Sequence, residues 1–235
     1  YRMEPAFVDK NWIKMFSRGY FWDAYWRTLG LACLSTIVTS LLAFPAAYAL
    51  SFKSSQQMRR WAIFLLIIPF FTSYVVRAYA WQVILAQQGV VNSLFAMVGL
   101  GPYVLLNSVF GTVVGYLTLT LPLVIILQTL SMSNVDRSMI EAAWNLGCSR
   151  LRAVFTVIIP MAKVGLIIGA LFCFILSFGD FVSPYYLGGS KPPTLSILII
   201  DTTKSGQQWP RAAVVAITMI VTLFVIAFTA VTLAY

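Results

Sequence analysis

The sequence predicts an all-α membrane protein, in which residues 1–235 form a single domain built as a bundle of kinked transmembrane helices. Hydrophobic residues make up 60% of the chain, charged residues make up 10%, and the mean hydropathy is +0.86. A soluble domain carries about 25% charged residues, so this chain has too little polar surface to cover a water-soluble globule. The long apolar runs are continuous, without the alternation expected of barrel strands. These observations exclude a cytosolic enzyme domain, a disordered regulator and a secreted module.

Five membrane spans are predicted from the charge-free stretches. A spanning helix needs about 20 predominantly apolar residues. Residues 28–52 and 78–135 carry no charge, and neither do residues 212–235. The predicted spans are Thr28–Leu50, Trp61–Leu85, Val104–Leu130, Ala162–Leu187 and Arg211–Tyr235.

Four of these spans contain a proline, namely Pro45, Pro69, Pro122 and Pro184. Proline removes a backbone donor and kinks a helix. Such kinks persist in a membrane where neighbouring helices or cavity water satisfy the freed carbonyls. The prolines therefore indicate either irregular packing or bent helices around a translocation cavity.

The first 27 residues are mixed polar and aromatic, which is typical of a segment at a membrane interface. The aromatic residues concerned are Trp12, Phe16, Tyr20, Phe21, Trp22, Tyr25 and Trp26. The loops 51–60 and 131–160 are basic, whereas residues 86–103 are uncharged, and this contrast places the two basic loops in the cytoplasm. Residues 1–27 also carry five basic residues, so the charge rule alone leaves the orientation open.

Composition excludes several other functions. The net charge is +9, but the basic residues are spread along the chain without the clustering of a nucleic-acid binder; we expect them to face lipid head groups. The chain has no histidine and only three cysteines without C-x-x-C spacing, so no metal site, disulfide framework or other cofactor is predicted. H-E-x-x-H, G-x-S-x-G and the phosphate-binding loop G-x-x-x-x-G-K-[ST] are absent, so we predict that the chain is no enzyme and has no usual loop for ATP phosphates.

The longest charged interruption between spans is residues 131–160, where a short amphipathic helix is predicted. Asn134 or Asp136 can cap it, because their side chains accept amide hydrogens of the first turn. Gly147 suits a left-handed C-terminal cap, and Ser149 can cap a second helix that rises to Pro160. One face is apolar at helical spacing, through Val135, Met139, Ala142, Ala143 and Leu146.

This helix is predicted to dock onto a cytoplasmic partner. Ala142 and Ala143 would let a partner backbone approach closely, and Glu141 could pair with an arginine there. The alternative is a helix lying on lipid head groups, whose polar face would be dominated by Lys and Arg. Here that face carries Asp136, Arg137 and Glu141, which favours docking.

The same segment resembles the EAA loop of permease subunits of type I ATP-binding-cassette importers. The matching positions are Glu141, Ala142, Ala143, Gly147 and Pro160. Val157 and Ile159 are mild departures from the family's isoleucine and leucine. The resemblance implies that these five residues couple the permease to separate ATPase subunits.

Two further blocks resemble the spermidine/putrescine branch of this family. They are residues 64–71 with 76–79, and residues 177–184 with 187–189. Permeases for ferric iron, sulfate, thiamine or opines share parts of them, so these substrates remain alternatives to polyamines. The resemblance implies the type I importer fold in a bacterial inner membrane. It further implies a second permease, expected to be a paralogue, and an extracytoplasmic substrate-binding protein.

The family usually has six spans, so the resemblance also implies that one N-terminal span is absent from this sequence. It places residues 1–27 and 188–210 on the outer side, which resolves the orientation. A secondary transporter or channel is the alternative class, but it would need no coupling loop, and no internal repeat is evident.

Arg77 and Asp180 are the ionisable residues that the predicted spans place well inside the membrane. Each costs about 2.5–3.5 kcal/mol there on insertion scales, which makes both functional candidates. They could neutralise each other, or they could line the substrate pathway. Aromatic faces and a carboxylate suit an organic cation, so Tyr79 and Phe178 complete the candidate pathway set.

Overall fold

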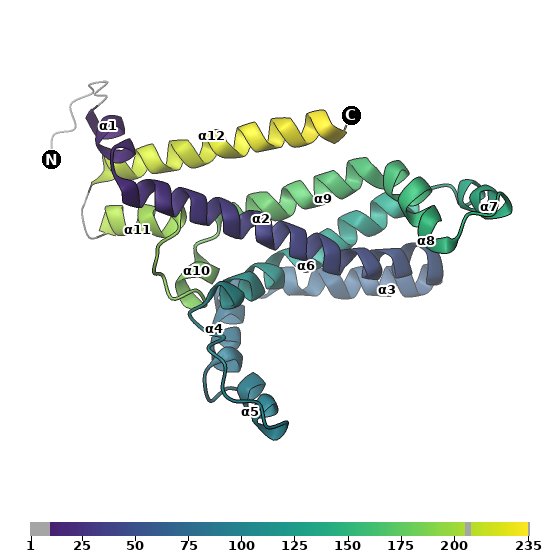
Figure 1. Cartoon of the computed structure of the whole chain (residues 1–235), viewed down its shortest axis with the longest axis horizontal. Coiled ribbons are helices and arrows are strands. Elements are labelled where there is room, and N and C mark those ends of the chain that lie inside the picture. Colours follow the sequence, from purple (N-terminus) through teal and green to yellow (C-terminus); the bar gives the residue numbers. More distant parts are fainter. Residues whose placement is uncertain (1–9, 205–207, 235) are drawn as a thin grey trace.

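Three long helices pack along one another and form the centre of the molecule (Figure 1): α2 (Gly19–Tyr48), α6 (Val109–Ser133) and α9 (Ile159–Gly179). The computed structural model describes residues 10–204 and 208–234. Within those ranges the chain is predominantly helical and contains no strand, so the predicted all-α class is confirmed.

Small residues on α2 explain this close packing. The buried face of α2 repeats every three or four residues, as a single helical stripe does, through Ala32, Ser35, Thr39, Ala43 and Ala47. Small side chains let membrane helices approach closely. The hydroxyls within the stripe also pair across the interfaces, with 3.3 Å between the Oγ1 atoms of Thr39 and Thr120 and 3.3 Å between the Oγ atoms of Ser35 and Ser177.

Four helical segments of the described ranges are long and apolar enough to cross a membrane: Gly19–Lys53, Val109–Ser133, Arg150–Gly179 and Trp209–Ala234. The first joins α2 to a π-helix, η1 (Ala49–Lys53). The third joins α8 (Arg150–Ala153), a second π-helix η3 (Val154–Ile158) and α9. The fourth is α12 (Trp209–Ala234). Four predicted spans thus have counterparts, although α2 begins at Gly19 and takes in residues assigned to the interfacial segment.

The predicted span Trp61–Leu85 is not one continuous helix, and it counts as a fifth span only if the two parts of a bent helix pair are taken together. The chain forms α3 (Gln56–Ile67), a 3₁₀ turn η2 (Ile68–Phe71) and α4 (Tyr74–Leu85), with a bend of 93° at the break. Pro69 has no amide hydrogen and its ring crowds the carbonyl four residues earlier, which disfavours the α-helix here, although Pro45 and Pro122 lie inside α2 and α6, which continue through them. Thr72 is extended, and its hydroxyl donates to the Pro69 carbonyl at 2.8 Å.

The predicted fourth span, Ala162–Leu187, is also too long at its C-terminal end. Helix α9 stops at Gly179, Asp180 is extended, and a short helix α10 (Val182–Tyr186) follows. Asp180 therefore lies beyond the spanning helix, where the sequence had placed it well inside. Pro184 sits in the first turn of α10 and kinks no spanning helix, because its missing amide hydrogen would be unpaired there in any case.

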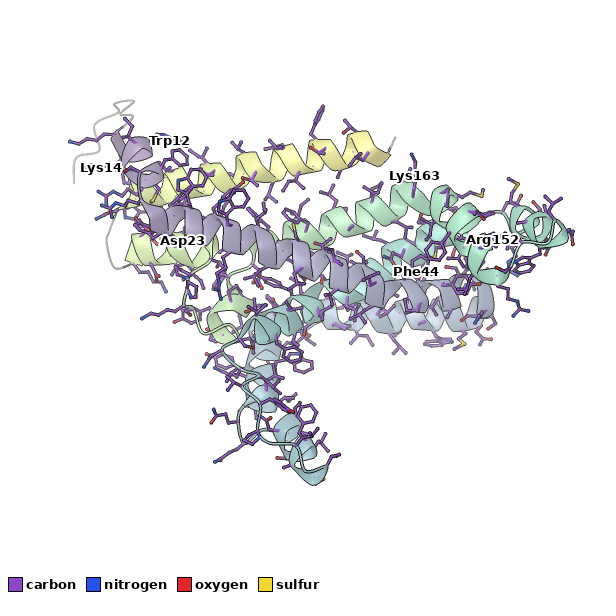
Figure 2. All side chains as sticks on the ribbon, in the orientation of Figure 1. Trp12, Lys14, Asp23, Phe44, Arg152 and Lys163 are labelled. Atoms are coloured by element: carbon purple, nitrogen blue, oxygen red, sulfur yellow. The ribbon has the colours of Figure 1, made fainter. Side chains whose placement is uncertain are left out.

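The remaining helices gather at the two ends of the bundle (Figure 1). Helices α1 (Lys10–Phe16) and α11 (Leu195–Lys204) lie at one end, and α7 (Arg137–Asn145) lies at the other, while α4 and α5 (Val90–Met97) project sideways. Figure 2 places Trp12, Lys14 and Asp23 at the first end and Arg152 at the second. Residues 1–9, 205–207 and 235, which belong to the predicted outer segments and last span, lie outside the described residues.

Candidate functional site

The loop predicted to couple the protein to an ATPase folds as a capped helix, α7, anchored on the bundle. Asp136 is its N-cap and accepts a hydrogen bond from the Ser138 amide at 2.9 Å. That bond lowers the pKa of the Asp136 carboxyl, because it favours the ionised form. Ile140 is buried in an apolar cluster with Met132, Val135 and Ile158. Of the two predicted caps, Asp136 is confirmed; Asn134 instead ends α6.

The turn after α7 has the predicted left-handed glycine. Gly147 has a φ of +83°, and the Cys148 amide donates to the Ala143 carbonyl at 3.0 Å. The Gly147 amide donates to the Trp144 carbonyl at 2.9 Å. This pair of bonds is the Schellman arrangement that closes a helix. Ser149 then caps α8 as predicted, since its hydroxyl accepts from the Arg152 amide at 3.4 Å.

The outer face of α7 is exposed and apolar. Met139, Trp144 and Leu146 are exposed, and 89% of Leu146 is accessible. Beside them Ala142 is exposed and Ala143 is half-buried. A cluster of exposed apolar side chains at one end of a molecule marks an interaction surface. The arrangement can receive another protein against its small residues.

Glu141 lines a small cavity beside this surface, and Pro160 lies in the first turn of α9. Glu141 lines a cavity of about 150 Å³ together with Tyr48, Phe52, Arg137, Ile140, Trp144 and Ile158. Pro160 follows Ile158 by two residues and occupies the first turn of α9, a position where its missing amide hydrogen costs nothing. Both π-helices contribute to the lining, through Phe52 of η1 and Ile158 of η3. Short π segments occur frequently at functional sites.

Asp180 holds two interrupted elements together at the opposite end of the bundle. Its carboxylate accepts hydrogen bonds from the Val182 amide at 2.8 Å and the Ser183 amide at 3.1 Å. The Tyr74 hydroxyl also donates to it, at 2.5 Å, and lies against the Ser183 hydroxyl. Tyr74 begins α4 and Asp180 precedes α10, so this cluster, the Tyr74–Asp180 latch, joins the elements that follow both breaks.

Helix α10 also packs tightly on α6. A Cβ atom added at Gly115 would lie 2.5 Å from the Ser183 Oγ and 2.6 Å from its Cβ. One added at Gly111 would lie 2.7 Å from the Leu187 carbonyl oxygen. The two glycines therefore provide the space in which α10 rests beside the latch.

Arg77 and Asp180 do not form an ion pair with each other. The Arg77 Nη1 atom donates to the Thr118 carbonyl of α6 at 2.9 Å, and the guanidinium lies over the Tyr74 ring, 5.5 Å from its centroid. Mutual neutralisation, one of the two alternatives raised by the sequence, is therefore not what this structure contains. Arg77 instead supports the latch through the Tyr74 ring.

The other two pathway candidates have different surroundings. Phe178 has no accessible surface and stacks on Phe174 at 5.4 Å in an apolar cluster, so it lines no cavity. Tyr79 is half exposed and opens into a cleft between α4, α10 and the chain leading to α11. The cleft also contains Tyr185, Tyr186, Asn107 and Asp201. Sequence reasoning missed Tyr186 as a ring partner of Tyr79 and missed Asn107 and Asp201 as lining residues of the same cleft, because no local pattern signals the proximity of such distant residues.

No group of three cysteine, aspartate or glutamate side chains in residues 10–204 and 208–234 is placed to bind a metal ion. The two candidate regions are thus a docking surface at one end and a polar cleft at the other.

Comparison with known proteins identifies the family. The family model described as "Binding-protein-dependent transport system inner membrane component" matches residues 35–234. The chain belongs to this family. The predicted membership of the importer-permease family is therefore confirmed, and the chain is an inner-membrane transport permease.

Relatives of this permease include the spermidine/putrescine transport system permease protein PotB. The Haemophilus influenzae protein is 27% identical over 93% of this chain and 77% of its own length. The Escherichia coli protein is 26% identical over 92% of this chain and 79% of its own. The E. coli inner membrane permease YdcU is 29% identical over 71% of this chain and 58% of its own. All three are transport permeases.

Solved importer structures share the fold of this permease. A bacterial transporter that imports the acidic polysaccharide alginate aligns with a TM-score of 0.75 and 17% identity, over 98% of this chain and 84% of that chain. The methionine transporter MetNI aligns with a TM-score of 0.67 and 15% identity, over 92% and 94%. At such identities the likeness concerns the fold alone, and it confirms the predicted importer-type helix bundle.

Proposed function

We propose that this permease forms the substrate pathway of an ATP-driven importer and docks its ATPase through α7. The observation that carries the proposal is the exposed apolar face of a capped helix at one end of the bundle. Glu141, Ala142 and Ala143 form the centre of that contact. Gly147 sets the turn that presents them, and Pro160 begins the helix that transmits the movement into the membrane.

The energy source is a separate subunit in this proposal. The chain contains no G-x-x-x-x-G-K-[ST] loop, so it lacks the usual backbone cradle for ATP phosphates. Closing of two ATPase subunits would press α7 against the η1 and η3 ends of the spanning helices. Because α9 runs from that end to Asp180, the push would reach the latch at the far end.

Similarity to the PotB proteins supports polyamines as the substrates of this permease. The PotB proteins of H. influenzae and E. coli are named for spermidine and putrescine transport and match most of this chain. The partners are then ATP-binding-cassette ATPases, a second permease that we take to be a paralogue, and an external binding protein. The alginate transporter has been solved with a substrate-loaded periplasmic protein, which supports the last of these partners.

The experiment compares Glu141→Ala and Gly147→Val in the reconstituted complex with its ATPase. Glu141→Ala removes the charged partner of the contact, and Gly147→Val forces a β-branched residue to a φ of +83°. Nothing lies within 4 Å of the position of an added Cβ at Gly147, so the second change acts through the backbone alone. Gly147→Asn is the matched control, because asparagine tolerates this conformation.

We expect both Glu141→Ala and Gly147→Val to lose substrate-stimulated ATP hydrolysis and uptake at normal membrane abundance, and Gly147→Asn to retain most of each. The measurements are uptake into proteoliposomes, ATPase rate and co-purification of the ATPase. Normal transport by both impaired variants, with the ATPase bound, would show that α7 is not the coupling element.

A further inference from the structure

The cleft that Tyr79 enters has the size and lining of a small-molecule site. Its volume is about 740 Å³, within the range of roughly 300–1,000 Å³ that ligand pockets occupy. It lies between α4, α10 and the chain leading into α11, at the end of the bundle opposite α7 (Figure 1). We call it the tyrosine cleft, after Tyr79, Tyr185 and Tyr186.

The three tyrosines present ring faces at several angles. The Tyr79 and Tyr186 centroids are 4.8 Å apart with a 53° tilt, and those of Tyr185 and Tyr186 are 5.0 Å apart at 78°. About half of Tyr79 and of Tyr185 is accessible. Ring faces carry partial negative charge and attract an ammonium group, and they also accept the apolar methylenes of an alkyl amine.

Polar groups around the rings add acceptors and one opposing charge. The side chains of Gln82 and Asn107 line the cleft, as does the carboxylate of Asp201. Lys191 lines it too, so the formal charges of the lining cancel. Selection of a cation must then come from the ring faces together with Asp201, while Lys191 weakens it.

The cleft is built on elements that the structure holds in fixed relation. The Tyr74–Asp180 latch ties the start of α4 to the start of α10, and so it sets Tyr79 opposite Tyr186. On the other side, the Asn107 amide donates to the Leu187 carbonyl at 2.8 Å. Both walls are therefore positioned before a ligand arrives, which reduces the ordering cost of binding.

We propose that the tyrosine cleft is a binding site for an alkyl amine cation on the outer side of the permease. This inference rests on the proposed function, which supplies the polyamine class and the orientation. The ammonium group lies against the faces of Tyr79 and Tyr186 and near Asp201, and the methylenes lie along Tyr185. Asp180 belongs to the latch and does not contact the amine.

The test measures equilibrium binding of radiolabelled spermidine to the purified permease–ATPase complex, without binding protein. Tyr186→Leu removes a ring face, and we expect it to raise the dissociation constant about fivefold or more. Tyr186→Phe keeps the face and should restore binding to within about twofold of wild type. Tyr103→Leu is the matched control, since Tyr103 is 48% exposed but lies outside the cleft.

Two variants that each remove one charge distinguish a cation site from a site for zwitterions or anions. Asp201→Asn should weaken spermidine binding, and Lys191→Gln should strengthen it, because each removes one sign of charge from the lining. The proposal is overturned if Lys191→Gln weakens binding, if Tyr186→Leu matches wild type, or if the wild-type complex binds no spermidine.

Spermidine-stimulated ATP hydrolysis in the presence of the binding protein is measured in parallel and reports on the proposed function. Binding without stimulation would refute polyamine transport while leaving the cleft supported. Two outcomes would refute the cleft while leaving the proposed function supported. In the first, spermidine stimulates ATP hydrolysis but the wild-type complex binds no spermidine in the absence of the binding protein. In the second, spermidine stimulates ATP hydrolysis but Tyr186→Leu binds it as tightly as wild type.

Discussion

Replacing Asp180 by asparagine tests whether this residue holds the fold together or binds substrate. The carboxylate is 9% exposed and accepts three hydrogen bonds, from the Val182 amide, the Ser183 amide and the Tyr74 hydroxyl. Asparagine has one acceptor oxygen, so its NH₂ group must face at least one of these donors. One lost hydrogen bond to a charged acceptor costs about 1.5–3 kcal/mol. The new NH₂ group also faces a donor without an acceptor between them, so we expect the free energy of unfolding to fall by about 2–4 kcal/mol in all.

The assay is thermal unfolding of the purified complex, with uptake and membrane abundance measured beside it. A loss of this size lowers the melting temperature by about 4–16 °C in a chain of this length. Tyr74→Phe removes one of the three bonds and should lower it by less. Asp180 and Tyr74 belong to one cluster, so their effects are not additive. The loss of unfolding free energy in the Tyr74→Phe/Asp180→Asn double variant should be at least about 1 kcal/mol smaller than the sum of the two single losses.

Two results would refute this reasoning. Asp180→Asn with wild-type melting and lost uptake would make Asp180 a substrate ligand. Restoration of stability by adding Arg77→Gln would mean that an ion pair with Arg77 is the important contact. We expect no restoration, since Arg77 donates to the Thr118 carbonyl and lies over the Tyr74 ring.

Three further predictions concern the packing of α10, the topology and the cap of α7. Gly115→Ala should destabilise the permease by about 1–3 kcal/mol, because its Cβ would lie 2.5 Å from the Ser183 Oγ; Gly30→Ala has nothing within 4 Å and should melt like wild type. Cys148 should react with a membrane-impermeant thiol reagent in inside-out vesicles but not in intact cells, with Cys148→Ser as the unlabelled control; labelling from outside would invert the topology. The lowered pKa of Asp136 means that its contribution to α7 is present above the usual carboxyl range and lost as pH falls through the folded pKa. Helicity of α7 should therefore decrease on acidification in wild type but not in Asp136→Asn, and equal pH profiles would contradict this.

The local structure of the loop 131–160 is the part of the candidate site that the sequence predicted best. Its signals act over a few residues. Asp136 accepts a hydrogen bond from the amide two residues later and caps α7, Gly147 ends α7 in a left-handed turn, and Ser149 caps α8. Interactions of such short range depend on the local residues and hardly on the rest of the fold. Hydropathy likewise located four spanning segments, because lipid requires long apolar helices in any arrangement.

Tertiary structure alone decided the end of the bundle opposite α7. The apolar sequence runs on through Pro69 and up to Asp180, where the helices end. Apolar composition does not show that a helix ends or that the chain changes direction. Tyr74 and Asp180 are 106 positions apart, and Tyr79 meets Tyr186 only because α4 turns by 93° away from α3. Contacts of that separation depend on how whole helices pack. The sequence therefore marked Asp180 as unusual, and only the folded chain showed that it accepts hydrogen bonds from the first two amides of α10 and from Tyr74.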